Sequence, residues 1–184
     1  ISTDGSGAFT RSFEIPPSTA GRHSIVVGGS ETGAASGSEI NFQVQPRLAL
    51  ENDTGPSGLT IQIVGSGFGP NEPNIEIKFG SDTVISGVSA DSKGNLEQSF
   101  LIPPNPAGQH KISTSSSTGS LFAQAQGTYT VVPNVDLSET TGSVGMELSV
   151  VGTGFNSDSN VTLTYDDVAV ATASSDVLGR FNLQ

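Results

Sequence analysis

The chain has 184 residues, with 23 Gly and 10 Pro but no Cys or Trp, and only 14% of its residues are charged. Eighteen Asp and Glu against seven Lys and Arg give a formal net charge of −11, which excludes the basic face of a nucleic-acid-binding protein and opposes docking to an anionic membrane. The lack of Cys excludes disulfide scaffolds and cysteine-based zinc or redox sites.

Local patterns predict an all-β protein. Gly and Asn are frequent, and both tolerate the positive φ that tight turns require. No convincing run places apolar residues at the helical spacing i, i+3, i+4, i+7. No run approaches the roughly 20 apolar residues of a membrane-spanning helix.

Residues 1–46 match a later part of the chain. The segment Ile1–Ile25 aligns without a gap with Val88–Ile112, 87 positions further on. The matched residues are Asp4 with Asp91, Gly7 with Gly94, Phe13 with Phe100, Pro16-Pro17 with Pro103-Pro104, Ala20-Gly21 with Ala107-Gly108, and His23 with His110. We therefore predict that residues 1–46 are the second half of a repeat.

Residues 47–133 are predicted to form one complete repeat. Alternating apolar residues mark its strands, because every second side chain of a strand points to the same face. These residues are Leu59, Ile61 and Ile63, then Ile75, Ile77 and Phe79, then Leu96, Phe100 and Ile102, then Ile112, and finally Tyr129 and Val131. With Leu48–Leu50 and Thr83–Ile85 they give about seven short strands, the number typical of an immunoglobulin-like β-sandwich.

Residues 134–184 are predicted to be the first half of a third repeat. The segment Gly145–Tyr165 resembles Gly58–Phe79, and one deletion keeps the two in register. A half sandwich cannot bury its sheet face alone. Two interpretations stay open: the chain is part of a longer array, or residues 134–184 of one subunit are completed by residues 1–46 of the next, as a filament or a ring.

The order of motifs resembles a known family. A Gly-(Ser/Thr)-Gly-Phe turn precedes an alternating strand, followed by Asp-x-x-Gly-x-(Phe/Leu) and then (Ile/Val)-Pro-Pro-x-x-Ala-Gly-x-His. This pattern resembles the IPT/TIG-like and related immunoglobulin-like repeats of bacterial and archaeal surface proteins, over essentially the whole chain. The resemblance implies a fold and a cell-surface setting with no particular activity. The family also occurs in intracellular DNA-binding proteins, a branch that the acidic charge argues against.

Recurrent Asp residues have two interpretations. Asp4, Asp91 and Asp176 each precede a Gly by three positions, so each is expected to accept hydrogen bonds from backbone N–H groups and fix a turn. The alternative is that they are calcium ligands, together with carboxylates near the hairpin tips at Asp82, Asp166 and Asp167. No Asp-x-Asp-x-Asp-Gly series accompanies them, and no other cofactor is expected.

Other motifs are expected to be structural. The turn Gly65–Phe68 lacks the Lys and the helix of a phosphate loop and is expected to be a tight bend with a buried Phe. His23 and His110, the only histidines, occupy the same repeat position and are expected to pack at the sandwich edge with a ring nitrogen bonded to backbone. Asn52 and Asn160 begin glycosylation sequons, which suit an exposed surface.

The sequence favours a structural protein over an enzyme. It has no Cys, no Gly-x-Ser-x-Gly elbow and no His beside an obvious nucleophile. We expect a spacer segment of an extracellular prokaryotic surface or filament protein, such as a surface layer, stalk or appendage. Its partners would be neighbouring repeats or identical subunits. The alternative is a ligand- or carbohydrate-binding module of an adhesin or secreted enzyme, which would display aromatics, whereas Tyr129 and Tyr165 are both expected in the core.

Overall fold

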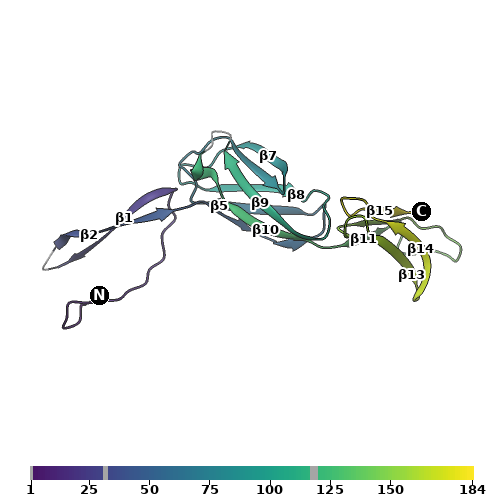
Figure 1. Ribbon diagram of the computed structural model, residues 1–184, viewed down its shortest axis with the longest axis horizontal. Helices are drawn as coiled ribbons and strands as arrows, with labels where there is room; N and C mark the ends of the chain where they lie inside the picture. Colours follow the sequence, from purple (N-terminus) through teal and green to yellow (C-terminus); the bar gives the residue numbers. More distant parts are fainter. Residues whose placement is uncertain (1, 31–32, 117–119) are drawn as a thin grey trace.

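The computed structural model of the chain describes residues 2–30, 33–116 and 120–184, with the backbone alone for 33–38. Within these ranges the chain is all-β, which confirms the predicted fold class, and one short 3₁₀ helix, η1, lies at Leu121–Ala123. Three parts follow one another along the long axis: an N-terminal hairpin, a central β-sandwich and a smaller C-terminal group of strands (Figure 1). The described residues contain no helix with the length and hydrophobicity that a membrane crossing requires.

The N-terminal part is an extended segment followed by a hairpin. Its strands are β1 (Gly21–Gly29) and β2 (Gly33–Val44), which pair antiparallel from Gly21 opposite Val44. A bulge between Val26 and Gly28 interrupts the ladder. The hairpin projects away from the central sandwich (Figure 1).

The central part packs two sheets face to face. One sheet has the order β3-β5-β8, from β3 (Arg47–Leu50), β5 (Thr60–Ser66) and β8 (Leu96–Leu101). The other has the order β4-β10-β9-β6-β7, from β4 (Thr54–Gly55), β6 (Ile75–Phe79), β7 (Asp82–Val88), β9 (Gly108–Ser116) and β10 (Gln126–Val131). The sequence did not predict β4, because a strand of two residues is too short to show alternation. β4 pairs parallel with β10.

The core of the central sandwich agrees with the predicted alternation. Ile61 and Ile63 from one sheet and Ile75, Ile77 and Phe79 from the other are at most 1% exposed. Leu59 is the exception and is 37% exposed, because it lies just before β5 begins.

The C-terminal part repeats this architecture without closing it. β11 (Asn134–Leu137), β12 (Val150–Thr153) and β15 (Phe181–Leu183) form one sheet in the order β11-β12-β15. β13 (Asn160–Tyr165) and β14 (Val168–Ser174) form a separate hairpin. The pairing of β11 with β12 runs from Asn134 opposite Thr153 to Leu137 opposite Val150, the register of β3 with β5 moved by 87 residues.

Candidate functional site

The joint between the N-terminal and central parts is built on the backbone of Phe68. Its side chain is fully buried, and Gly67 before it has φ 72°, which confirms the expected tight bend. The Phe68 amide donates to the Gly94 carbonyl at 3.0 Å, within the central unit. The Phe68 carbonyl accepts a hydrogen bond of 2.9 Å from the backbone amide of Ala20. Ala20 belongs to the N-terminal part. The backbone of one residue thus bonds both to a turn of the central part and to the N-terminal part.

The joint between the central and C-terminal parts has the same hydrogen bonds. The Phe155 amide donates to the Gly179 carbonyl at 3.0 Å, and the Phe155 carbonyl accepts from the amide of Ala107 at 3.1 Å. Ala107 and Phe155 are the repeat counterparts of Ala20 and Phe68, each 87 residues later. The chain therefore joins consecutive units twice in the same way.

The glycines at these joints are closely packed against the preceding part of the chain. A Cβ on Gly67 would lie 2.9 Å from the Gln45 carbonyl oxygen, and a Cβ on Gly154 would lie 2.6 Å from the Val132 carbonyl oxygen. The strands of consecutive units are separated only by residues 45–46 at the first joint and 132–133 at the second, and each pair ends in Pro. Since Pro fixes its own φ, the connection is short and stiff. These contacts restrict how neighbouring parts can move relative to each other.

The three recurrent Asp residues make the same turn three times. Asp4 Oδ1 accepts from the amides of residues 6 and 8 at 2.9 Å, and Asp91 Oδ1 accepts from Lys93 and Asn95 at 2.8 and 2.7 Å. Asp176 Oδ1 accepts from Leu178 and Arg180, both at 2.9 Å. The turn interpretation of the sequence is therefore confirmed by hydrogen bonds that repeat in all three units.

Hydrogen bonding lowers the pKa of each of these carboxyl groups. For the pKa of Asp4 the largest cause is a hydrogen bond from the Ser6 hydroxyl. For the pKa of Asp91 and of Asp176 it is a hydrogen bond from a backbone amide, that of Asn95 and of Arg180 respectively. Donors that face a carboxylate stabilise its charged form. These aspartates therefore stay ionised and hold their turns, and those of Asp91 and Asp176 lie beside the two joints.

The calcium alternative gains no support from the geometry. The three Asp residues lie in different units, and the described residues contain no group of three or more His, Asp or Glu that could hold a metal ion. Asp166 and Asp167 form the tip of the β13–β14 hairpin with φ 46° and 64°, and Asp82 begins β7. The structure brings none of these carboxylates together with the recurrent Asp residues.

Each histidine packs as the sequence indicates. His110 Nε2 lies 2.8 Å from the Pro106 carbonyl oxygen, and its ring stacks on Phe79 with centroids 5.2 Å apart. His23 Nε2 lies 2.8 Å from the Thr19 carbonyl oxygen, the same contact one repeat earlier. Both imidazoles therefore fix the Pro-Pro-x-x-Ala-Gly loop that carries the joint alanine.

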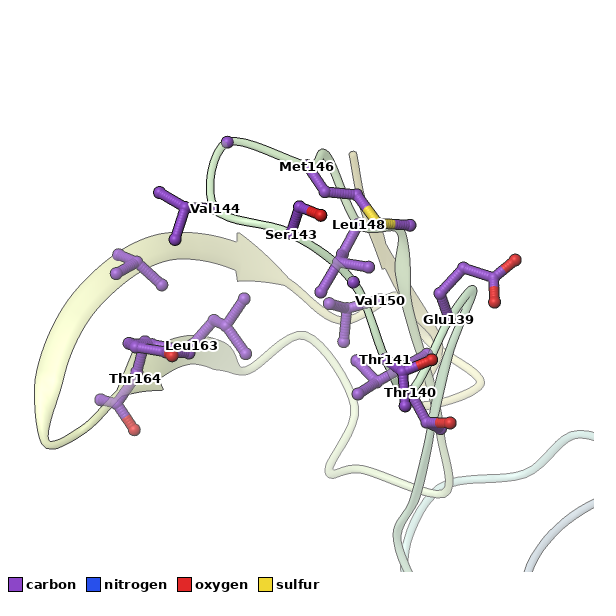
Figure 2. A pocket seen from close by; sticks show the side chains of 15 residues that line it. Glu139, Thr140, Thr141, Ser143, Val144, Met146, Leu148, Val150, Leu163 and Thr164 are labelled. Atoms are coloured by element: carbon purple, nitrogen blue, oxygen red, sulfur yellow. The ribbon is translucent and has the colours of Figure 1, made fainter.

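The C-terminal part has an open core. Tyr165 is 73% exposed, which corrects the expectation that it lies in the core. Its counterpart Phe79 is buried because β9 pairs with β6 and covers it, whereas the counterparts of β9 and β10 are β1 and β2, at the far end of the chain. Tyr165 is one of the residues that line an open hollow of about 850 Å³, here called the C-terminal hollow. Figure 2 shows Met146, Leu148 and Val150 on one side of it and Leu163 on the other.

The N-terminal part exposes the complementary half of a core. Phe13 is 62% exposed, Ile15 and Phe42 are each 41% exposed, and with the half-buried Ile25 they line a shallow apolar surface, here called the N-terminal face. Their counterparts in the central unit are all buried, namely Phe100, Ile102, Tyr129 and Ile112.

Both predicted sequon residues reach the surface. Asn52 lies exposed between β3 and β4, and Asn160 is exposed at the start of β13. The geometry of either residue leaves its amide open to solvent, as glycosylation would require.

The chain matches no protein-family model and no curated protein sequence. What the chain can do is therefore argued from its joints and its open core faces.

Proposed function

We propose that this chain is a rod-like spacer of tandem immunoglobulin-like units in an extracellular prokaryotic surface or filament protein. The observation that supports the proposal best is the repeated joint, in which Ala20 with Phe68 and Ala107 with Phe155 make the same backbone contact. Units that are joined in one orientation without a flexible linker form a rod of defined length and direction, as a spacer requires.

Surface chemistry supports the same function. A net charge of −11 on a chain with seven basic residues opposes nonspecific adhesion to other acidic surfaces. The central part, with two antiparallel sheets and a short parallel contact at β4, supports the immunoglobulin-like part of the proposal.

The two most exposed aromatic rings do not favour the carbohydrate-binding alternative. Phe13 and Tyr165 are exposed, but they occupy the repeat positions of Phe100 and Phe79, which are core residues in the central unit. Their exposure follows from an open core and needs no sugar ligand.

The rigidity of the joint can be tested by distance measurements between two spin labels. Because the chain has no Cys, Asp82→Cys with Val168→Cys gives two unique labels at equivalent exposed positions of the central and C-terminal units. We expect one narrow distance distribution by double electron–electron resonance. As the control, about six Gly-Ser residues inserted between Val132 and Pro133 should broaden it. A distribution as broad in the unmodified chain as in the insertion variant would contradict a rigid spacer.

A further inference from the structure

The chain enters and leaves the central unit at opposite ends. β3 begins at Arg47, shortly after β2 ends at Val44, and β10 ends at Val131, shortly before β11 begins at Asn134. The N-terminal hairpin and the C-terminal strands lie at opposite ends of the central sandwich (Figure 1). Tension along the rod would therefore pull on β3 at one end of the unit and on β10 at the other.

The strands of entry and exit are bonded to each other. After β3 the chain continues into β4, which pairs parallel with β10. The amide of Thr130 donates to the Asp53 carbonyl at 2.7 Å, and the amide of Val132 donates to the Gly55 carbonyl at 3.1 Å. β4 is the edge strand of its sheet, so β10 is its one partner strand within the described residues. The segment through which the chain enters is thus held by the strand through which it leaves.

Two glycines let the entering segment lie close to β10. A Cβ on Gly55 would lie 2.5 Å from the hydroxyl oxygen of Tyr129 in β10 and 2.8 Å from the Leu59 side chain. A Cβ on Gly127, also in β10, would lie 2.7 Å from the side chain of Leu50 at the end of β3. Both β3 and β4 therefore pack closely against the strand through which the chain leaves.

The parallel pairing decides how tension would act on this contact. β4 and β10 both run toward the C-terminal part. Tension would draw β4 toward the N-terminal part and β10 toward the C-terminal part, so the two strands would slide along each other. Hydrogen bonds of a sheet lie across its strands, so sliding loads both bonds together, whereas a pull across the sheet opens them one after the other. Bonds that have to break together give a higher barrier to unfolding, and that barrier sets the unfolding force.

We propose that the central unit carries tension along the rod and that the contact of β4 with β10 resists it. The chain has no Cys, so hydrogen bonds and packing alone have to oppose unfolding under load. This inference goes beyond the proposed function, because a spacer can set a distance without bearing any load.

Pulling single molecules in two directions tests this proposal. Because the chain has no Cys, a pair of introduced Cys residues defines where the force acts. Gln43→Cys with Asp136→Cys, both exposed and just outside the central unit, load it along the rod. Asn52→Cys with Ser86→Cys, both exposed, load its sheet across the strands, from the edge beside β4 to the edge at β7. At one loading rate, the axial unfolding force should be at least about twice the crosswise force.

Three single variants separate this contact from overall stability. Val132→Pro removes the N–H that donates to Gly55, at a position just after β10 ends, where Pro is tolerated. Val132→Ala is the matched control, because it keeps that N–H. Ile77→Val removes a methyl group from the core outside both strands and lowers stability in another place.

Only the first of these variants should weaken resistance to axial force. Val132→Pro should lower the axial unfolding force by about one third and leave the crosswise force unchanged, since it removes one of two bonds that are loaded together. Val132→Ala and Ile77→Val should change the axial force by less than half as much. Melting temperatures verify that each variant folds, and the comparison of the two directions needs none of the three.

An axial force no higher than the crosswise force would overturn the proposal. Equal losses of axial force in Val132→Pro and Val132→Ala would also overturn it, as would losses that only follow the melting temperatures of the three variants. The spin-label distances are measured without load and depend on the joint instead. A narrow distance distribution in a chain that unfolds at the same force in both directions would therefore reject load bearing and leave the spacer function standing. A broad distribution with a higher axial force would do the opposite.

Discussion

The carbonyl oxygen of Phe155 accepts a hydrogen bond of 3.1 Å from the amide of Ala107, which lies in the preceding unit of the chain. The same bond joins Phe68 to Ala20, at 2.9 Å. Each carbonyl also lies under a glycine of its own unit, Gly179 or Gly94, which has φ 70° or 75° and no room for a side chain. The joint and the fold of the unit that follows it thus depend on the same peptide group.

Replacing Gly94 tests how tightly this peptide group is held. Gly94→Ala combines a left-handed backbone with a Cβ that meets the Phe68 carbonyl, so we expect the free energy of unfolding to fall by about 3 kcal/mol or more. Gly80→Ala is the control, because Gly80 has φ 59° and no described atom within 4 Å of a new Cβ. Gly80→Ala should lower the free energy of unfolding, measured by urea denaturation, by only about 1–2 kcal/mol. Equal losses in the two variants would show that the contact with Phe68 does not matter.

Tyr129 has a buried hydroxyl that finds no hydrogen-bond partner among the described residues. The atom points at Gly55, where an added Cβ would lie 2.5 Å away. Tyr129→Phe should therefore stabilise the central unit by about 1 kcal/mol, since an unpaired buried hydroxyl is removed. The chain itself has Phe42 at the equivalent position. Tyr165→Phe, at an exposed position, should leave the melting temperature unchanged, and a loss of stability in Tyr129→Phe would contradict this account.

The same substitution should change how stability depends on alkaline pH. Burial raises the pKa of Tyr129 above its ordinary value near 10, because the charged phenolate is disfavoured in the core. The stability is complete below the unfolded pKa and is lost as pH rises from there toward the folded pKa. Tyr129→Phe should flatten this loss above pH 10 in melting curves, whereas Tyr165→Phe should keep it.

Asp91 should make the stability of the central unit sensitive to acid. Its carboxylate accepts hydrogen bonds from the backbone amides of Asn95 and Lys93, which hold its pKa below the ordinary value of 3.8. A lowered folded pKa gives stability that is present above the unfolded pKa and is lost as pH falls through the folded pKa, so the loss begins below about pH 4. Asp91→Asn keeps an oxygen acceptor and should lose part of this dependence, while Asp91→Ala should lower the melting temperature at neutral pH as well. An acid profile unchanged in both variants would exclude the turn as its source.

The sequence by itself determined the β-class, the repeat and most of the core. Ile61, Ile63, Ile75, Ile77 and Phe79 alternate with polar residues, and alternation has a direct physical cause in the pleat of a strand. The recurrent Asp turns could be predicted for a similar reason, because side-chain oxygen and backbone amides only a few residues apart form them.

Burial at the two ends was decided by tertiary structure. Tyr165 and Phe79 have the same pattern around them in the sequence, yet one is exposed and the other buried, because β9 and β10 cover only the second. Exposure depends on which strands extend the sheet beside a residue, and those strands lie far away in the chain.

The joint was also decided by tertiary structure alone. Gly67 and Gly154 were explained from the sequence as turn residues, and their positive φ agrees with that. The atoms around them give a second reason for glycine, because a Cβ at either position would collide with a carbonyl oxygen that follows the last strand of the preceding unit. The bond from Ala107 to Phe155 joins two backbone groups, and every residue except Pro has both of them. Nothing in the identity of the side chains marks such a bond, so only the fold, by bringing the two peptides together, could reveal it.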